Sequence, residues 1–185
     1  MSKRDDILTA TLDLISEEGL QSLTFSKLFR RANVGSGTVY HYFSNKEELV
    51  GALYIRTIDH FSDVMLQHYN RSENVYACFK RLLANMAGFA QNYQREQWFL
   101  ENYSHSPFLS EEIRNRDIPA MAECMLLIHR GTEEGLIRKM NPLMCVQMIS
   151  GMLMGAVQGA LLGKYRIDDK ELENVIEICW RAFVI

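Results

Sequence analysis

Residues 36–43 read SGTVYHYF and follow the tight turn Asn33-Val34-Gly35. Val39 and Phe43 are four residues apart, so on a helix they share one face, which we expect to pack inward. The opposite face carries small side chains at the helix start and hydrogen-bonding rings behind them. A helix of this kind can offer its N-terminal residues to base edges in a DNA groove. The stretch therefore predicts a DNA-recognition helix.

The segments before this stretch complete a helix-turn-helix. Apolar residues recur at helical spacing over residues 3–18, and Gly19 ends that run as a C-terminal glycine. Thr24 is a suitable N-cap for a second helix over residues 25–32. Two short helices on either side of one small turn are typical of this DNA-binding motif.

Positive charge is concentrated in the same part of the chain. The formal net charge is −3, yet residues 24–46 contain no Asp or Glu and carry Lys27, Arg30, Arg31 and Lys46. Lys46, beside the start of the next helix at Asn45, is placed to hold a phosphate through its charge and the free backbone N–H groups. We expect polyanion binding in this stretch.

The order of residues over 7–49 resembles the DNA-binding domain of the TetR family of transcriptional regulators. The resemblance rests on Ile7-Leu8-x-Ala10, Gly19, Leu23-Thr24, Leu28, Ala32, Val34 and the run GTVYHYFSNKEEL at 37–49. It implies that base and phosphate contacts come from the positions Ser26, Ser36, Gly37, Thr38, Tyr40, His41, Tyr42 and Lys46.

The resemblance also implies separate roles for these positions. Ser36 and Gly37 lie at the base-reading end of the recognition helix, and Lys46 anchors a phosphate. Gly35 stands where the family often has a capping Ser, and Ser36 stands where a Lys is frequent, so this chain departs from the pattern at both positions. The alternative to DNA contact, strongest for His41, is packing within the helical bundle.

The rest of the chain is expected to be helical. Patterns and caps predict a helix from Asn45 to about residue 69, then helices over about 73–93, 110–135 with a kink or restart at Pro119, 143–163 and 169–184. No segment is typical of a strand. We predict an all-α fold of about nine helices, with a DNA-binding domain at 1–46 and a ligand-sensing and dimerisation domain at 47–185.

Aromatic and methionine side chains are dense in the second domain. They can line an apolar cavity that binds a small molecule, although each of them is also typical of an ordinary core. A metal site is not expected, because His105 and His129 lack partners at ligand spacing. The candidate ligand-binding residues are Phe61, Met65, Met86, Phe89, Trp98, Phe99, Tyr103, Met125 and His129.

Small residues repeat along the apolar stretch 143–163. Gly151, Gly155, Gly159 and Gly163 recur every fourth residue, so another helix can approach closely. We expect a homodimer through the last two helices, in which Ile176, Trp180 and Phe183 complete the interface. Two recognition helices would then lie about one DNA turn apart, roughly 34–36 Å, on a palindromic operator.

A second interpretation of this stretch is a transmembrane helix with small-xxx-small spacing, which would make the chain a membrane-associated adaptor. Gln147, Ser150 and Gln158 interrupt the apolar run, and no Trp/Tyr belts flank both ends. We therefore favour a subunit interface and no membrane partner.

Other function classes receive little support from the sequence. There is no GxSxG, HExxH, P-loop or dinucleotide glycine pattern, so we expect neither an enzyme nor a cofactor. Cys78, Cys124, Cys145 and Cys179 form no CxxC pair, and the first residues lead into an amphipathic helix, so we expect a reducing cytoplasm. The sequence predicts a ligand-responsive regulator that acts as a repressor and is released by a small, mainly apolar molecule, with aromatic and cationic molecules among the candidates. No residue fixes the sign of that coupling.

Overall fold

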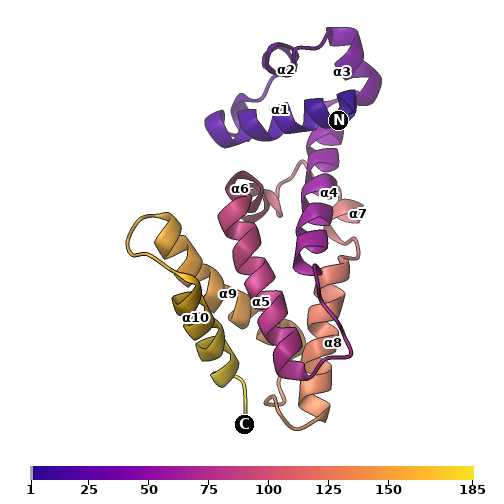
Figure 1. The fold of residues 1–185 in the computed structure, drawn as a ribbon. Helices are drawn as coiled ribbons and strands as arrows, with labels where there is room; N and C mark the ends of the chain where they lie inside the picture. The colour runs from indigo at the N-terminus through magenta and orange to yellow at the C-terminus, as the bar shows by residue number, and fades with distance from the viewer. Residues whose placement is uncertain (1) are drawn as a thin grey trace. The chain divides into compact units, whose positions relative to one another are not determined.

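The computed structural model describes residues 2–185 and confirms the all-α class (Figure 1). The only β pairing described in that range is an isolated bridge between Ile137 and Val184. Ten α-helices and one 3₁₀ turn follow one another as α1 (Lys3–Glu18), η1 (Leu20–Ser22), α2 (Phe25–Ala32), α3 (Ser36–Tyr42), α4 (Lys46–Met65), α5 (Val75–Asn92), α6 (Gln94–Tyr103), α7 (Glu111–Arg114), α8 (Pro119–Glu133), α9 (Pro142–Leu161) and α10 (Asp169–Arg181).

The helix count exceeds the expected total of about nine, because the segment 110–135 forms two helices and α6 lies where no helix range was predicted. α7 ends at Arg114, and Ile118, with φ −115° and ψ 111°, is extended. The residue before a proline is pushed out of the helical region, and proline itself is well tolerated at the first helical position. Pro119 therefore starts α8 instead of kinking one long helix.

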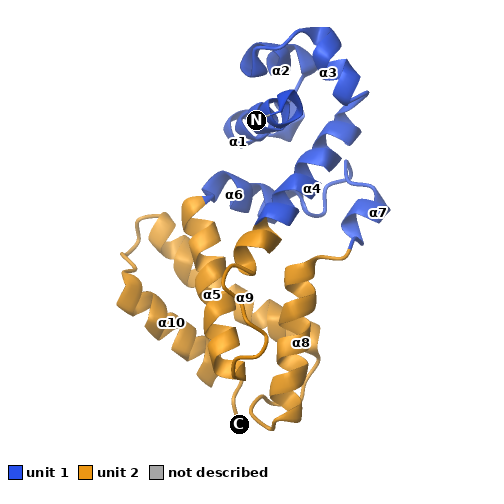
Figure 2. Cartoon of the chain, turned by 45° about the vertical axis from the view of Figure 1, so that its right-hand side comes forward, with its two compact units in different colours: residues 1–60, 93–116 blue, residues 61–92, 117–185 orange. Residues whose placement is uncertain are grey.

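The chain divides into two compact units, coloured separately in Figure 2. Unit 1 contains residues 1–60 and 93–116, and unit 2 contains residues 61–92 and 117–185. The predicted domain boundary after residue 46 coincides with the start of α4, inside unit 1. Helices α6 and α7 also belong to unit 1, where α6 contacts α1.

Unit 1 has a core of aliphatic side chains from its first four helices. Ile7, Leu8, Leu28 and Val39 are fully buried, and Phe43 is 2% exposed. Burial of side chains of this size contributes about 1.5–3 kcal/mol each. This core fixes α2 and α3 against α1, so the remaining faces of α2 and α3 can face solvent.

Unit 2 is a bundle in which α5 contacts α8, α9 and α10. Among residues 2–185, α9 is the one helix that is long and apolar enough to cross a membrane by length and composition, a test that core helices also pass. α9 buries Ile149, Leu153 and Val157 in the unit 2 core. The apolar residues of α9 are thus explained by packing within the chain.

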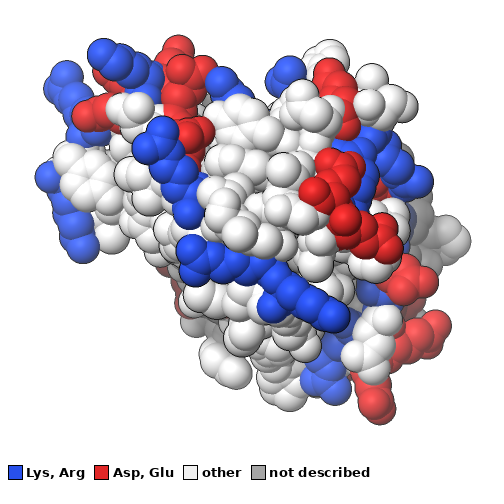
Figure 3. All heavy atoms as spheres, turned by 90° about the horizontal axis from the view of Figure 1, so that it is seen from below, with Lys and Arg blue, Asp and Glu red and all other residues white. Residues whose placement is uncertain are grey.

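The surface mixes charges of both signs. Figure 3 shows one face of the molecule, on which Lys/Arg and Asp/Glu side chains lie around a broad uncharged area. Exposed apolar side chains in unit 2 include Met144, Met148 and Met152 on α9 and Ile178 on α10. Such residues mark faces that partners can cover.

Candidate nucleic-acid interface and cavity

The turn between α2 and α3 is built by local backbone chemistry. Thr24 caps α2 by accepting a hydrogen bond from the Lys27 amide at 3.4 Å. Asn33 ends α2 in the left-handed region, at φ 50°, a conformation that Asn tolerates better than most residues. Gly35 is the N-cap of α3 and supplies no side-chain bond, whereas its carbonyl oxygen accepts from the Thr38 amide at 3.0 Å.

The two faces of α3 differ as the sequence predicted. Val39 and Phe43 are buried, whereas Ser36, Gly37 and His41 are exposed. Thr38 and Tyr42 are half-buried, Tyr40 is 54% exposed, and Ser26 on α2 is exposed. A polar, partly bare surface at a helix start can approach another macromolecule closely.

Gly37 is the barest point of this surface. A Cβ atom built there would meet no heavy atom within 4 Å, and the backbone is ordinary α-helix. Neither packing nor backbone conformation in this chain requires a glycine, which is also a poor helix former. The remaining structural use of a glycine at position 37 is to leave space for a molecule outside the chain.

Tyr40 is exposed yet held in direction by α2. Its ring packs edge-on against Phe25 and Phe29, with centroid distances of 5.1 and 5.9 Å. Contacts of this kind contribute about 0.5–1.5 kcal/mol beyond burial. The phenol is therefore presented at the surface from a fixed position.

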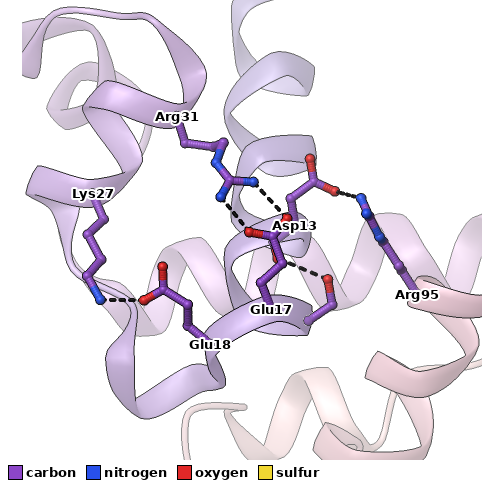
Figure 4. Close-up of polar contacts among 7 residues, drawn as sticks. Asp13, Glu17, Glu18, Lys27, Arg31 and Arg95 are labelled. Atoms are coloured by element: carbon purple, nitrogen blue, oxygen red, sulfur yellow. Dashed lines mark hydrogen bonds and ion pairs between the residues drawn. The ribbon is translucent and has the colours of Figure 1, made fainter.

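Two of the basic residues of α2 have acidic partners that the sequence of α2 itself does not contain. Figure 4 shows Lys27 paired with Glu18 at 2.5 Å and Arg31 with Glu17 at 2.5 Å, both acids coming from the end of α1. The Arg31 hydrogen bond lowers the pKa of Glu17, and the same contact raises the pKa of Arg31. Arg30 donates instead to the Ser26 carbonyl oxygen at 3.4 Å. Two of these cations would have to exchange a carboxylate for a phosphate.

Lys46 makes contacts that the sequence did not indicate. Its ammonium group donates to the Leu20 carbonyl oxygen at 2.6 Å and lies 5.1 Å from the centroid of the Phe108 ring. Partial burial lowers its pKa. The Leu20 amide in turn donates to the Tyr103 hydroxyl at 3.3 Å. Both backbone groups of Leu20 are thus bound by side chains from α4 and α6.

The start of α4 is capped as predicted. The Glu48 amide donates to the Asn45 side-chain oxygen at 2.8 Å, and the Glu48 carboxylate accepts from the Ser44 amide at 2.8 Å. Such reciprocal bonds satisfy amides that a helix start leaves without partners. They join the loop after α3 rigidly to α4.

Unit 2 contains an apolar cavity of about 40 Å³. Two of the predicted ligand-binding residues, Met65 and Met86, line it. The other lining residues are Phe79, Leu82, Leu83, Cys124, Leu127, Ile128, Val146, Ile149 and Ser150. Sequence reasoning missed these because their aliphatic pattern is that of any helical core.

The remaining predicted ligand-binding residues lie elsewhere. Phe61 and Phe89 pack edge-to-face at 5.1 Å in unit 2, and Met125 is half-buried beside the same core. His129 is exposed and pairs with Glu133 at 3.2 Å. Trp98, Phe99 and Tyr103 belong to α6 in unit 1, where Phe99 is fully buried.

The predicted dimer residues fall into two sets. Gly151 and Gly155 are exposed on α9, and Gly163 follows that helix at φ 71°. Gly159 is covered by the Tyr165 ring, whose hydroxyl donates to the Ala156 carbonyl oxygen at 3.0 Å. Ile176 and Phe183 are 2% and 3% exposed in the unit 2 core, and Trp180 packs on Tyr76 and Phe79.

The last helix therefore turns its apolar stripe inward. An amphipathic pattern shows that one face needs a partner, and here α5 and α9 of the same chain provide it. The exposed large apolar residue of α10 is Ile178, at 60%. Over residues 2–185 no group of three or more His, Cys, Asp or Glu side chains is placed to hold a metal ion.

Comparison with known proteins gives matches over both parts of the chain. The sequence profile of bacterial regulatory proteins of the tetR family matches residues 7–53, and that of the tetracyclin repressor-like C-terminal domain matches residues 54–185. An uncharacterized HTH-type transcriptional regulator from Haemophilus influenzae is 25% identical, covering 96% of this chain and 94% of that protein.

Solved structures agree with these matches. A TetR-family transcriptional regulator from Haemophilus influenzae has a TM-score of 0.82 at 26% identity, covering 99% of this chain and 97% of its own. A TetR-family regulator from Marinobacter aquaeolei VT8 shares the fold with a TM-score of 0.89 at 21% identity, covering 98% and 95%.

Proposed function

The chain belongs to the TetR family of DNA-binding transcriptional regulators, and from this membership we propose that it is a cytoplasmic, ligand-responsive repressor that binds a palindromic operator as a homodimer. A regulator of this family is not an enzyme. The membrane-adaptor interpretation of residues 143–163 is not favoured, since the family profile runs through that stretch.

The observation that carries the proposal is the exposed face of α3. Ser36 and Gly37 stand at its open N-terminus, and Tyr40 is held at the surface by two rings of α2. In this role Ser36 and Gly37 lie against base edges. Ser26, Thr38, Tyr40, His41, Tyr42 and Lys46 share the remaining base and phosphate contacts.

Lys46 needs a change of partner to act as a phosphate anchor. Its ammonium now binds the Leu20 carbonyl, and a phosphate oxygen is the stronger acceptor because the hydrogen bond is charge-assisted at both ends. Lys27 and Arg31 would also have to change partner, but they already bind carboxylates, so each would exchange one charge-assisted bond for another. Binding should therefore depend steeply on salt.

The dimer is proposed to form through the outward faces of α9 and α10. The bare backbone at Gly151 and Gly155 and the exposed apolar side chains Met148, Met152 and Ile178 are the surface proposed to contact a second copy. Ile176, Trp180 and Phe183 support this face from inside, because they hold α10 in the core.

The regulatory step is proposed to run through α4. A ligand that prefers the unit 2 conformation in which the two recognition helices are wrongly spaced releases the operator, and a coupling of about 1–3 kcal/mol is typical. Asn45 and Glu48 transmit such a shift, because they tie the end of α3 to the start of α4.

The test is a gel-shift titration of the full chain on the DNA beside its own gene, with competitor DNA and fixed salt. We expect specific binding that Tyr40→Phe weakens and Tyr40→Ala removes, while circular dichroism stays helical. Tyr40→Phe is the matched control, because it keeps the ring contacts with Phe25 and Phe29 and removes only the hydroxyl. Specific binding unchanged in both variants would refute the assignment of α3.

A further inference from the structure

The unit 2 cavity has a uniform chemistry. Its walls are the thioether chains of Met65 and Met86, aliphatic side chains and the Phe79 ring. None of the described lining residues is Asp, Glu, Lys, Arg or His. A charge placed in it would lose its hydration without gaining an opposite charge, which is strongly unfavourable.

Cys124 and Ser150 are the polar exceptions, and both are uncharged. Burial raises the pKa of the Cys124 thiol to about 11, with Glu123 as a lesser cause, so the thiol stays protonated at neutral pH. The Glu123 carboxylate binds the Arg71 guanidinium through two hydrogen bonds. Ser150 therefore provides the one side-chain hydroxyl of the wall.

The volume of about 40 Å³ corresponds to roughly three waters, so a small organic molecule needs a wider cavity. Met65 and Met86 can supply it. Unbranched thioether side chains change rotamer easily and adapt to the shape of an apolar partner. The cavity thus combines an apolar wall with two of the most adaptable side chains.

We propose that the effector of this regulator is an electrically neutral, mainly hydrocarbon molecule that binds among Met65, Met86, Cys124 and Ile149, with Ser150 facing its single polar group. The inference rests on the proposed function, since it names the ligand class for the sensing step.

The experiment uses three probes with the same chain and different head charges: 1-hexanol, hexanoate and hexylammonium. Each is titrated into the full chain at neutral pH by calorimetry, and its effect on the melting temperature is recorded. We expect 1-hexanol to bind and to raise the melting temperature, and the two ions to bind at least about tenfold more weakly.

A pair of variants locates the site. Cys124→Phe places a ring in the cavity and should abolish 1-hexanol binding, whereas Leu126→Phe places the same ring on the exposed side of α8 and should leave it unchanged. If Cys124→Phe does not fold, the smaller Cys124→Met serves, with a reduced affinity expected.

Equal or tighter binding of either ion would overturn the proposal. So would 1-hexanol binding that the Cys124 variants leave intact, or no binding of any probe. Operator binding in the absence of probe is measured on the same preparations. It tests the proposed DNA-binding function separately, so failure of the ligand class and failure of the regulator assignment give different results.

Discussion

The exposed face of α3 and the cavity of unit 2 are built in opposite ways. On α3, hydrogen-bonding side chains stand at the surface of a helix whose other face is buried, and two rings of α2 hold Tyr40 in direction. In the cavity, apolar side chains meet one another without directional bonds. Under the proposed function, the first arrangement would select a partner by geometry and the second by volume and lack of charge.

Because of this difference, we expect some substitutions to change operator affinity and others to change the free energy of unfolding. A substitution on the α3 face at a position without contacts inside the chain, such as Gly37, should hardly lower the free energy of unfolding. Substitutions in the unit 2 core remove contacts that hold the chain together. Three substitutions test how complete this separation is.

Phe89→Ala should have the largest effect. Phe89 is fully buried and packs edge-to-face on Phe61, so its truncation should lower the free energy of unfolding by about 3–5 kcal/mol. Urea unfolding measures the change. Leu126→Ala, at a 47% exposed position on α8, is the control and should change it by no more than about 0.5 kcal/mol. A loss from Phe89→Ala as small as the control's would contradict the packing described for unit 2.

Gly37→Ala should move affinity and stability in opposite directions. The added methyl group meets nothing in the chain and favours the helix, so the melting temperature should rise, by the equivalent of up to about 1 kcal/mol. The same methyl group would contact the DNA, so the free energy of operator binding should become less favourable by about 1–3 kcal/mol.

Gly88→Ala is the matched control for this variant. A Cβ atom at Gly88 on α5 also meets no heavy atom within 4 Å. Its stability should rise similarly while operator affinity stays the same. Unchanged operator affinity in Gly37→Ala would show that α3 does not approach DNA at its N-terminus.

Glu17→Gln should have the smallest effect on stability. The hydrogen bond from Arg31 lowers the pKa of Glu17 in the folded state below its ordinary value of 4.5. The ion pair therefore stabilises the fold at pH values above 4.5, and this contribution is lost as the pH falls through the lowered pKa. Unfolding followed against pH should show a slight wild-type advantage at neutral pH that disappears in acid.

The same variant should bind non-operator DNA more tightly, because Arg31 no longer has a carboxylate partner. Glu112→Gln in α7 makes the same change in net charge away from the α2 cations and serves as the control. Equal DNA affinity for the two variants would mean that Glu17 does not restrain Arg31.

Local features of the DNA-binding part could be predicted from sequence. The inward position of Val39 and Phe43, the cap at Asn45 and the stop at Gly19 all follow from spacings of four residues or fewer. The charge of α2 was misjudged because the count covered residues 24–46. The acids that pair with Lys27 and Arg31 lie just before that window, on α1.

Features that depend on helix packing could not be predicted in the same way. The apolar stripe of α10 was visible, but periodicity does not tell whether its partner is another chain or α5 and α9 of the same chain. Of the aromatic and methionine residues chosen for a pocket, Met65 and Met86 line the cavity, whereas α6 contributes its rings to unit 1. The composition of a sequence indicates which residue types can line a cavity. It does not indicate which of those residues come together in the fold.

The binding of Leu20 has a consequence for which substitutions position 20 of this chain can accept. Lys46 and Tyr103 hold Leu20 only by its backbone, from 26 and 83 positions away. Every residue type offers that carbonyl oxygen, and every type except proline offers that amide. Substitutions at position 20 can therefore follow the needs of the buried side chain alone, because both hydrogen bonds end on backbone atoms. Helices α4 and α6 are therefore bonded to the turn after α1 at a position whose side chain takes no part in either hydrogen bond.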